Sequence, residues 1–566
     1  MIKVCLNLLA KYSSKNNLIL IITLLIASNI LVFLTYIFIP ILALSLLHDG
    51  KMIEATSLKN FDLIKMNFSF FEIAYLTVFF AFLGNFFSIL YLKTSNNLCS
   101  LVGARIQLHY FRFFLNKNYE YFLKKENSIF SNDIVIDIVR LINGVFVPFF
   151  SLLNALFLGI ILITGIVYVN PQISLSILIF LTLIYFSIFS WFKKKFYATS
   201  DVISENQKSI LELTSFSFSL NKDVKLYNLS NYLNKKISEN ILSTSKIRSY
   251  VNFITLSPKY LIEGILVTSI ILSLILIYKY NLNSTNLLVN FSFILILMLK
   301  ILPTIQQIYV NLNTINSNKS LLKKFKTIPN ITKGNINKKK IIFNKIIEIK
   351  NLHFAYIKNL KIFSNLNLKI KKGSKIMIVG SNGSGKSTLA NILMGLIRPN
   401  KGNILIDKKE YYHENLATIY SSLETAPCFV NASLEENISY KKELNHEEKI
   451  KIKKIIYKSE LQNKASLFER KKLNKNIALK LSQGEKQKIA FARHLFFEKE
   501  FLVIDEGTSN LSINLENNFF KMLKKEYPNL TILYISHRMK NHSSFDEVYA
   551  IKNKKLSKFS KIKKFK

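Results

Sequence analysis

The chain has 566 residues, enough for two domains, and 50% of them are hydrophobic, with a mean hydropathy of +0.23 that is high for a soluble protein. Its three cysteines, Cys5, Cys99 and Cys428, are scattered, which argues against a disulfide framework or a cysteine-based metal site. The formal net charge of +42 would suit a protein that binds nucleic acid. However, the excess of Lys over Arg, together with abundant Asn, Ile and Phe, is equally typical of a general bias in composition, and we expect no nucleic-acid partner.

The first half of the chain has the pattern of a membrane domain. Long, mainly apolar stretches run roughly over 18–47, 70–92, 144–168, 172–192, 259–279 and 286–310. Each is near the about 20 residues that a helix needs to cross a bilayer. One such stretch fits a buried helix of a soluble protein, but six predict six membrane helices. The first is too long for a cleavable signal and lacks a small-residue cleavage site.

The two long segments between crossings predict the orientation. Segments 93–143 and 193–258 are rich in Lys and Arg, while the turn Asn170-Pro-Gln172 has neither, so both segments are expected on the cytoplasmic side, near anionic lipid. Their apolar spacing predicts membrane helices prolonged into the cytoplasm. Tyr119-Glu-Tyr-Phe122 and Lys222-Asp-Val-Lys-Leu-Tyr227 are candidates for the far turns, although an aromatic cluster at a turn can be a packing feature only.

Ionisable residues inside membrane segments are the candidates for substrate contact, because charge is costly there. Glu263 and Lys300 stand out, and either could meet a polar or anionic part of a substrate. The competing interpretation is that Glu263 lies near the cytoplasmic end and that Lys300 snorkels or pairs with it. Pro303 is expected to loosen the sixth helix, because it removes a backbone hydrogen bond.

The second half is expected to be a separate α/β domain. We place the membrane domain at 1–316, a polar linker rich in Lys and Asn at 317–345, and a nucleotide-binding domain at 346–566.

A phosphate-binding loop follows the apolar run Lys375-Ile-Met-Ile-Val379. The loop reads Gly380-Ser-Asn-Gly-Ser-Gly-Lys386-Ser387-Thr388, a pattern whose glycines let backbone N–H groups and a helix N-terminus approach nucleotide phosphates. Lys386 is expected to reach the β- and γ-phosphates of ATP, and Ser387 to hold Mg²⁺. A Gly/Ser-rich loop can match by chance, but the strand before it and the apolar Leu389-Ala-Asn-Ile-Leu393 after it supply the right context.

Two further strands end in candidate catalytic residues. Phe501-Leu-Val-Ile-Asp505-Glu506 is an apolar strand that ends in two carboxylates, of which Asp505 can organise the metal and Glu506 can polarise an attacking water. Thr531-Ile-Leu-Tyr-Ile-Ser-His537 brings a histidine to the carboxyl edge of the sheet, where open α/β folds bind ligands. A structural histidine is the alternative.

Leu481-Ser-Gln-Gly-Glu-Lys-Gln487, followed by an amphipathic helix through Arg493, resembles the signature of ATP-binding-cassette (ABC) transporters. The usual wording there is Leu-Ser-Gly-Gly-Gln, and the segment contacts the γ-phosphate of ATP bound to the opposite subunit. Ser482 and Gly484 agree with that wording, whereas Gln483 and Glu485 depart from it. A hydroxyl and open backbone at a helix start suit an anion, and Glu485 would repel that anion unless it points away.

The resemblance also implies roles for other residues, which are compared with the family pattern one position at a time. Tyr356 corresponds to the aromatic residue that stacks on adenine. Thr425 stands where the family has the glutamine that links the nucleotide to the membrane domain. After Glu506 the family generally reads Ala-Thr-Ser-Ala-Leu-Asp, whereas this chain reads Gly507-Thr-Ser-Asn-Leu-Ser512, so Ser512 replaces the aspartate. The expected ATP-binding residues are Tyr356, Gly380, Ser381, Asn382, Gly383, Ser384, Gly385, Lys386, Ser387 and Thr388.

The resemblance covers nearly the whole chain and implies a type I exporter fold: an all-α membrane domain of six helices fused to an α/β phosphate-loop ATPase. The implied function is an ATP-driven exporter or flippase of the bacterial cytoplasmic membrane, with its ATPase domain in the cytoplasm and ATP and Mg²⁺ as cofactors. Short patterns around 222–227, 257–263 and 300–303 look like flippases of lipid-linked oligosaccharides, which implies a lipid-like or amphipathic substrate.

Other functions stay open at this stage. One is an exporter of peptides or hydrophobic compounds, although no peptidase-like Cys/His segment precedes the first membrane helix. Another is the weakly hydrolysing, regulatory half of a heterodimer, suggested by Gln483, Glu485, Thr425 and Ser512. One chain holds one phosphate loop and one signature, so a second half-transporter is required, and we expect a homodimer.

Overall fold

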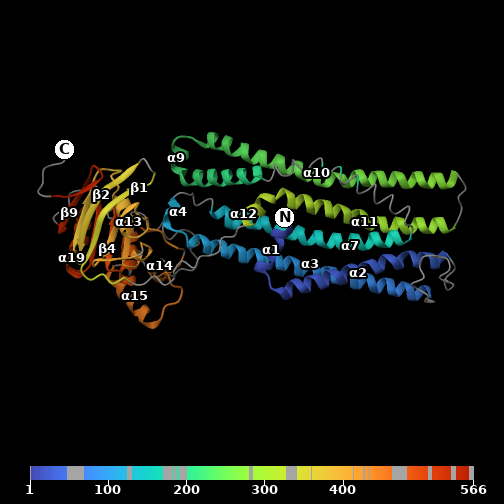
Figure 1. Cartoon of the computed structure of the whole chain (residues 1–566), viewed down its shortest axis with the longest axis horizontal. Helices are drawn as coiled ribbons and strands as arrows, with labels where there is room; N and C mark the ends of the chain where they lie inside the picture. The colour runs from blue at the N-terminus through green and yellow to red at the C-terminus, as the bar shows by residue number, and fades with distance from the viewer. Residues whose placement is uncertain are drawn as a thin grey trace. The chain divides into compact units, whose positions relative to one another are not determined.

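The structure is a computed structural model, and its description covers most of the chain. The described residues are 2–47, 69–123, 130–169, 183, 187, 190, 201–279, 285–326, 341–357, 360–411, 413–424, 427–430, 432–459, 461, 481–507, 513–536 and 544–559. The chain divides into two compact units, which are drawn together in Figure 1 and are described one at a time below. Unit 1 comprises residues 1–117 and 125–332, and unit 2 comprises residues 118–124 and 333–566.

Unit 1 is helical throughout its described part. Its helices are α1 (Ile2–Tyr12), α2 (Lys15–Leu47), α3 (Phe70–Leu115), the π-helical η2 (Asn132–Ile136), α6 (Asp137–Leu141), the π-helical η3 (Ile142–Phe146), α7 (Val147–Val169), α9 (Asn221–Leu226), α10 (Ser230–Lys279), α11 (Thr285–Ser317) and α12 (Lys319–Lys326). Residues 201–219 are helical as well.

The long helices of unit 1 pack side by side and leave apolar side chains outside. Helix α2 lies along α3, and α7 lies along α11 (Figure 1). At the first of these contacts a β-carbon on Gly84 would lie 3.0 Å from the backbone nitrogen of Val32, so glycine allows the two helices to approach closely. The outward face of α3 carries large exposed apolar side chains, with Phe82 at 75% exposure. An apolar face of this kind is suited to lipid.

The structure supports the predicted membrane segments where it describes them. Three helical spans in the described residues are long and apolar enough to cross a membrane, namely Lys15–Ile39, Phe70–Leu115 and Asn132–Gly165. The stretches predicted at 259–279 and 286–310 fall within α10 and α11. The stretch predicted at 172–192 lies almost wholly outside the described residues.

The predicted prolongation of membrane helices agrees with the helix lengths. Helix α3 has 46 residues and α10 has 50. At 1.5 Å per residue, these helices are about 70 Å long, against about 30 Å for the hydrocarbon core of a bilayer. Both helices are therefore long enough to continue well beyond a membrane.

Helix α12 lies inside the stretch that the sequence suggested as a polar linker. Its apolar side chains Leu321, Leu322 and Phe325 are buried, and the ring of Phe325 contacts that of Tyr110 with centroids 5.0 Å apart. Lys324 pairs with Asp133 and, at 2.6 Å, with Asp137, both in the segment that contains the π-helical turns. The start of the linker is thus a helix that is packed onto unit 1.

Unit 2 contains two sheets in its described part. The first has the order β2-β1-β4-β5 and the second the order β10-β9-β3-β8-β7-β6. The strands are β1 (Ile346–Ala355), β2 (Lys361–Lys371), β3 (Lys375–Val379), β4 (Lys401–Ile406), β5 (Lys409–Glu410), β6 (Tyr420–Glu424), β7 (Phe501–Asp505), β8 (Thr531–Ser536), β9 (Glu547–Lys552) and β10 (Lys555–Lys558). The helices are α4 (Tyr119–Leu123), α13 (Lys386–Leu393), the 3₁₀ helix η4 (His413–Thr418), α14 (Leu434–Ser439), α15 (His446–Lys458), α18 (Gln483–Phe497) and α19 (Ile513–Glu526).

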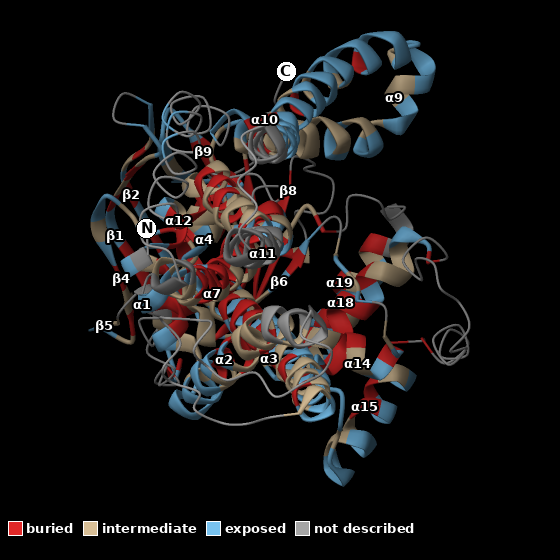
Figure 2. Cartoon of the chain, turned by 90° about the vertical axis from the view of Figure 1, so that its right-hand side faces the viewer, coloured by how far each residue is buried: buried red, intermediate tan, exposed pale blue. Residues whose placement is uncertain are grey.

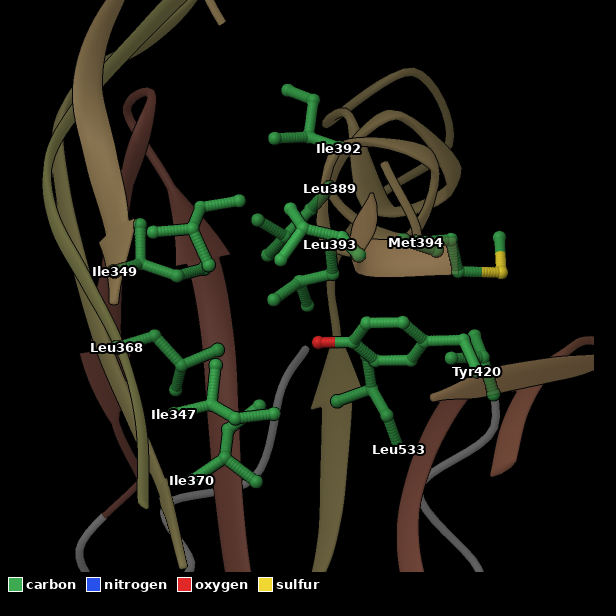
Figure 3. Close-up of a cluster of buried hydrophobic side chains, with 14 of the residues drawn as sticks. Ile347, Ile349, Leu368, Ile370, Leu389, Ile392, Leu393, Met394, Tyr420 and Leu533 are labelled. Carbon is green, nitrogen blue, oxygen red and sulfur yellow. The ribbon is translucent and has the colours of Figure 1, made fainter. Parts of the chain in front are cut away.

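Helix α13 is held between the two sheets of unit 2. Figure 3 shows Leu389, Ile392 and Leu393 of α13 on one side of a buried apolar cluster and Ile347, Ile349, Leu368 and Ile370 of the first sheet on the other. Tyr420 and Leu533 of the second sheet belong to the same cluster. Burial of this kind contributes about 25 cal/mol for each Å² of apolar surface removed from water. The start of α13 is therefore fixed relative to both sheets.

Candidate functional site

The carboxyl ends of parallel strands bring the predicted residues of unit 2 to one edge. Strands β3, β6, β7 and β8 are parallel neighbours, with Val379 in register with Ser536 and Glu424 in register with Asp505. The phosphate loop follows β3, and the two carboxylates end β7. Ligands of open α/β sheets bind at such an edge.

The phosphate loop has the backbone conformation that its glycines predict. Gly385 is the N-cap of α13 with φ +97°, and Gly383 has φ +79°. A β-carbon on Gly385 would meet Ile362 and Phe363, so the left-handed turn is closely packed as well as strained for any other residue. The Lys386 ammonium is buried and donates to the carbonyl oxygens of Gly380 at 2.9 Å and Ser381 at 3.0 Å. The lysine is therefore held at the mouth of the loop.

Asp505 and Ser387 are brought together. The Ser387 hydroxyl lies close enough to the Asp505 carboxylate to lower its pKa, and the carboxylate oxygen Oδ1 is buried and has no hydrogen-bond partner. Burial and the nearby Glu506 raise the pKa of Asp505, and the Ser387 hydroxyl and the Lys386 ammonium oppose that rise. A buried carboxylate with an orphaned oxygen beside a hydroxyl fits the ligand set of a hydrated Mg²⁺ ion, whose own charge would relieve the burial.

Glu506, which follows Asp505, has an unusual backbone conformation. Its φ is +51°, in the left-handed region, and its N–H donates to the carbonyl oxygen of Ile535 at 3.0 Å. An isolated antiparallel bridge joins its backbone to that of Glu424. Such conformations cost roughly 1–3 kcal/mol for a residue other than glycine and tend to occur at functional sites.

Several predicted positions lie outside the described residues. They are His537, Ser512 and Thr425. The neighbours of two of them are described, since Ser536 ends β8 beside Val379 and Glu424 ends β6 beside Asp505. Strands β6 and β8 therefore end at the edge that carries the phosphate loop.

Tyr356 is half exposed and lies beside the start of α13. Its hydroxyl is 3.3 Å from the hydroxyl of Thr388, and its ring contacts that of Phe354 edge-on, with centroids 4.9 Å apart. The ring thus has a fixed position near the loop and an exposed surface, as a stacking platform requires.

The signature segment forms a capping box. Ser482 is the N-cap of α18, and its hydroxyl accepts from the N–H of Glu485 at 3.3 Å. In return, Oε2 of Glu485 accepts from the N–H of Ser482 at 2.8 Å. Gln483 and Gly484 form the first turn between them. The Glu485 carboxylate is therefore turned back onto the helix N-terminus, and glutamine could make the same contact.

The sequence pattern places Arg493 only within an amphipathic helix, yet its side chain joins α18 to the segment that follows β6. Its guanidinium lies 4.9 Å from the ring centroids of both Phe429 and Tyr440, and it donates to the carbonyls of Cys428 at 2.7 Å and Asn437 at 2.8 Å. Helix α18 also has a buried face, red in Figure 2, that packs on α14 and α15. A lone arginine within an apolar helical face is the signal that could have identified this position.

Helix α4 belongs to unit 2, which is consistent with the predicted far turn at 119–122. Oε1 of Glu120 accepts from the N–H of Arg398 at 2.8 Å. Partial burial and the negative charge of Glu424 raise the pKa of Tyr119, with a smaller effect from Tyr356. The hydroxyl of Tyr119 thus lies within electrostatic reach of two residues at the nucleotide edge. Helix α9, at the other predicted turn, belongs to unit 1 and has no buried residue.

The two candidate substrate residues of unit 1 have different partners. Glu263 pairs with Lys259, one helical turn earlier, at 3.7 Å. The ammonium of Lys300 lies 5.5 Å from the ring centroid of Tyr36 in α2. The suggested pairing of Glu263 with Lys300 is therefore replaced by these two contacts. Both residues remain partly exposed to the surroundings of the helices.

Comparisons with known proteins agree with this architecture. The sequence profile of the family "ABC transporter" matches residues 363–509. The lactococcin-G-processing and transport ATP-binding protein LagD of Lactococcus lactis subsp. lactis is 25% identical over 491 residues, which are 82% of this chain and 67% of LagD. The ATP-dependent lipid A-core flippase of Photorhabdus laumondii is 31% identical over 216 residues, 37% of either chain.

A solved structure extends the agreement to the fold of the whole chain. The structure of a bacterial Atm1-family ABC exporter with ATP bound has a TM-score of 0.72 and covers 96% of this chain and 94% of its own, at 16% sequence identity. The described helices and sheets thus have the fold of an ABC exporter, with an ATP-binding ATPase domain and a multi-pass membrane domain in one chain. The chain belongs to the ABC transporter family.

Proposed function

We propose that this chain is one half of an ATP-driven exporter or flippase of a bacterial cytoplasmic membrane, with its ATPase domain in the cytoplasm. The observation that carries the proposal is the edge where Lys386, Ser387, Asp505 and Glu506 meet, in a chain whose other unit presents apolar helices to lipid. The proposed substrate is lipid-linked or otherwise amphipathic and leaves the cytoplasmic leaflet by alternating access.

Different residues of the chain have different roles in binding and hydrolysing the nucleotide. The phosphate loop, 380–388, binds the phosphates through its N–H groups and Lys386, and Tyr356 stacks on the base. Ser387 and Asp505 are the residues that would hold Mg²⁺, which supplies charge neutralisation at the phosphates. Glu506 takes a proton from the attacking water, and to His537, which lies outside the described residues, we assign the orientation of the γ-phosphate.

The site requires a second copy of the chain. Ser482 through Glu485 lie at the N-terminus of α18, where an N–H group and a hydroxyl suit a phosphate, and in the dimer they would face ATP held by the other phosphate loop. The tip of the cytoplasmic extension around α9 carries exposed apolar side chains beside its charged ones, with Leu226 at 66% and Tyr227 at 72% exposure. We propose that it rests on the partner, and we take the homodimer as the simplest assembly.

The substrate assignment draws on charge in the membrane unit. Lys300, held over Tyr36, offers a cation next to an aromatic face, which suits an anionic group attached to an apolar body. Glu263 is the second candidate contact. The flippase relative supports a lipid substrate, although its similarity covers only 37% of this chain.

Peptide export is the second candidate, and LagD favours it. That similarity extends over 82% of this chain and so includes the membrane unit. A peptide with apolar and anionic parts would use the same Lys300 and Glu263 contacts.

Vesicles that contain the purified chain would separate these functions. A fluorescent sugar-linked lipid placed in one leaflet should become accessible in the other on addition of ATP, and Lys300→Ala should slow this transfer more than it slows basal ATP hydrolysis. Uptake of a labelled hydrophobic peptide, with no lipid transfer, would favour the peptide-exporter function over the flippase function. ATP binding without hydrolysis would point to the regulatory half of a heterodimer, and co-purification with a different half-transporter would identify that assembly.

A further inference from the structure

The backbone after β7 lies directly against the end of β6. A β-carbon built on Gly507 would lie 2.5 Å from the carbonyl oxygen of Leu423, 3.0 Å from its carbonyl carbon and 3.2 Å from its β-carbon. The nearest two of these atoms are backbone atoms of a strand that is paired with β7, Leu423 being in register with Ile504. They cannot turn aside as a flexible side chain would, so position 507 has room for glycine alone while β6 and β7 keep this register.

The residue before Gly507 is held at the same place. Glu506 is bridged to Glu424 through the backbone, donates its N–H to Ile535, and keeps a left-handed φ of +51°. A left-handed residue other than glycine persists only where its surroundings hold it. The contact between residues 506–507 and 423–424 is part of those surroundings, and it is made by backbone on both sides.

We propose that the end of β6, residues Leu423 and Glu424, positions the carboxylate of Glu506 through this glycine-dependent backbone contact. The inference rests on the catalytic role proposed for Glu506. Gly507 is then a positioning residue, because it acts through Glu506 and has no side chain of its own with which to contact ATP. Movement of the end of β6 would move the catalytic carboxylate with it.

The location of α4 gives this contact a further role. Partial burial and the negative charge of Glu424 raise the pKa of Tyr119 in α4, and Oε1 of Glu120 in α4 accepts from the N–H of Arg398. Glu424 at the end of β6 is thus bridged to Glu506 and is near enough to Tyr119 of α4 to act on it electrostatically. A shift of α4 has a short path to the catalytic carboxylate that does not require the side chain at position 425.

The test is Gly507→Ala in the full chain in lipid, measured as kcat and KM for ATP together with binding of a fluorescent ATP analogue. Alanine stands at this place in the family pattern that the sequence resembles, so the change would look harmless. Displacement of a catalytic group by about 1 Å costs on the order of 10–100-fold. We expect kcat to fall by that factor, while KM and ATP binding stay within about twofold, because the phosphate loop is untouched.

Two variants serve as controls. Gly264→Ala in α10 adds the same methyl group at a position with nothing within 4 Å, and it should hydrolyse ATP like the wild type. Glu506→Gln should abolish hydrolysis, and if it does not, the proposed catalytic role is wrong. If Glu506→Gln is inactive but Gly507→Ala has the wild-type kcat, or loses ATP binding as steeply as it loses rate, the positioning inference is overturned.

A fourth variant keeps the test decisive if Gly507→Ala does not fold. Leu423 is buried, and Leu423→Ala opens space into which the end of β6 can shift. Leu423→Ala alone should then lower kcat while ATP binding stays within about twofold, because a shift of the end of β6 displaces the Glu506 carboxylate. A folded Leu423→Ala variant with the wild-type kcat would contradict the inference.

Discussion

His494 allows a pH prediction whose size can be worked out. It is 5% exposed in α18, its Nδ1 lies 2.6 Å from the hydroxyl of Ser421 in β6, and its ring stacks on Phe491. Burial lowers the pKa of His494 from 6.5 to about 4. The folded chain therefore keeps this imidazole neutral at a pH where the unfolded chain protonates it.

The direction in which stability changes with pH follows from the number of protons bound by the folded and the unfolded chain. Between the folded pKa of about 4 and the unfolded value of 6.5, the unfolded chain binds more protons, so stability falls as the pH falls. The full difference corresponds to about 3 kcal/mol. Of this, about 2 kcal/mol is lost between about pH 7.5 and about pH 5, which is about 4–8 °C in the unfolding temperature of a unit of this size.

The assay is thermal unfolding of the purified chain in detergent across that range, for the wild type and for His494→Gln. Glutamine can still hydrogen-bond Ser421 but does not titrate. Between about pH 7.5 and about pH 5, the unfolding temperature of His494→Gln should therefore fall about 4–8 °C less than that of the wild type. Because carboxylates and other histidines titrate in both proteins, only the difference between the two slopes counts. Parallel slopes would refute the buried neutral state of His494.

Three further changes test other parts of the chain. Lys386→Ala removes the ammonium at the mouth of the phosphate loop and should weaken ATP binding at least about tenfold, measured by equilibrium titration with a fluorescent analogue. Glu485→Ala breaks the capping box and should lower ATP hydrolysis, whereas Glu485→Gln keeps the box and the activity; equal loss in both variants would show that the charge itself matters. Phe325→Ala empties a fully buried site against Tyr110 and should cost about 3–5 kcal/mol, seen as a lower unfolding temperature, with Lys326→Ala on the exposed side of α12 as the control.

The local parts of the site could be predicted from the sequence because they depend on residues that lie a few positions apart in the chain. The glycines at 383 and 385 have the left-handed conformation that a phosphate loop demands, and Ser482 caps a helix where the motif places one. The apolar stretches near 18–47 and 70–92 are likewise long enough to be identified by length and composition alone.

The parts that were missed depend on contacts between distant segments. Helix α12 reads as a polar linker because most of its residues are polar, and only the packing of Phe325 on Tyr110 shows why it is folded. The partner of Lys300 is Tyr36, more than 260 positions earlier in the sequence. At Gly507 the sequence departs from the family pattern, but the structural reason for glycine there is the approach of Leu423, which no spacing along the chain reveals.

The central claim is that Lys386, Ser387, Asp505 and Glu506 form a working ATPase site in a self-sufficient half-transporter. The most direct measurement is the rate of ATP hydrolysis by the purified chain in lipid vesicles, wild type beside Glu506→Gln, with binding of ATP measured on both. We predict hydrolysis by the wild type and its loss in the variant, with ATP binding retained by both. An inactive wild type that still binds ATP, or a variant as active as the wild type, would contradict the account.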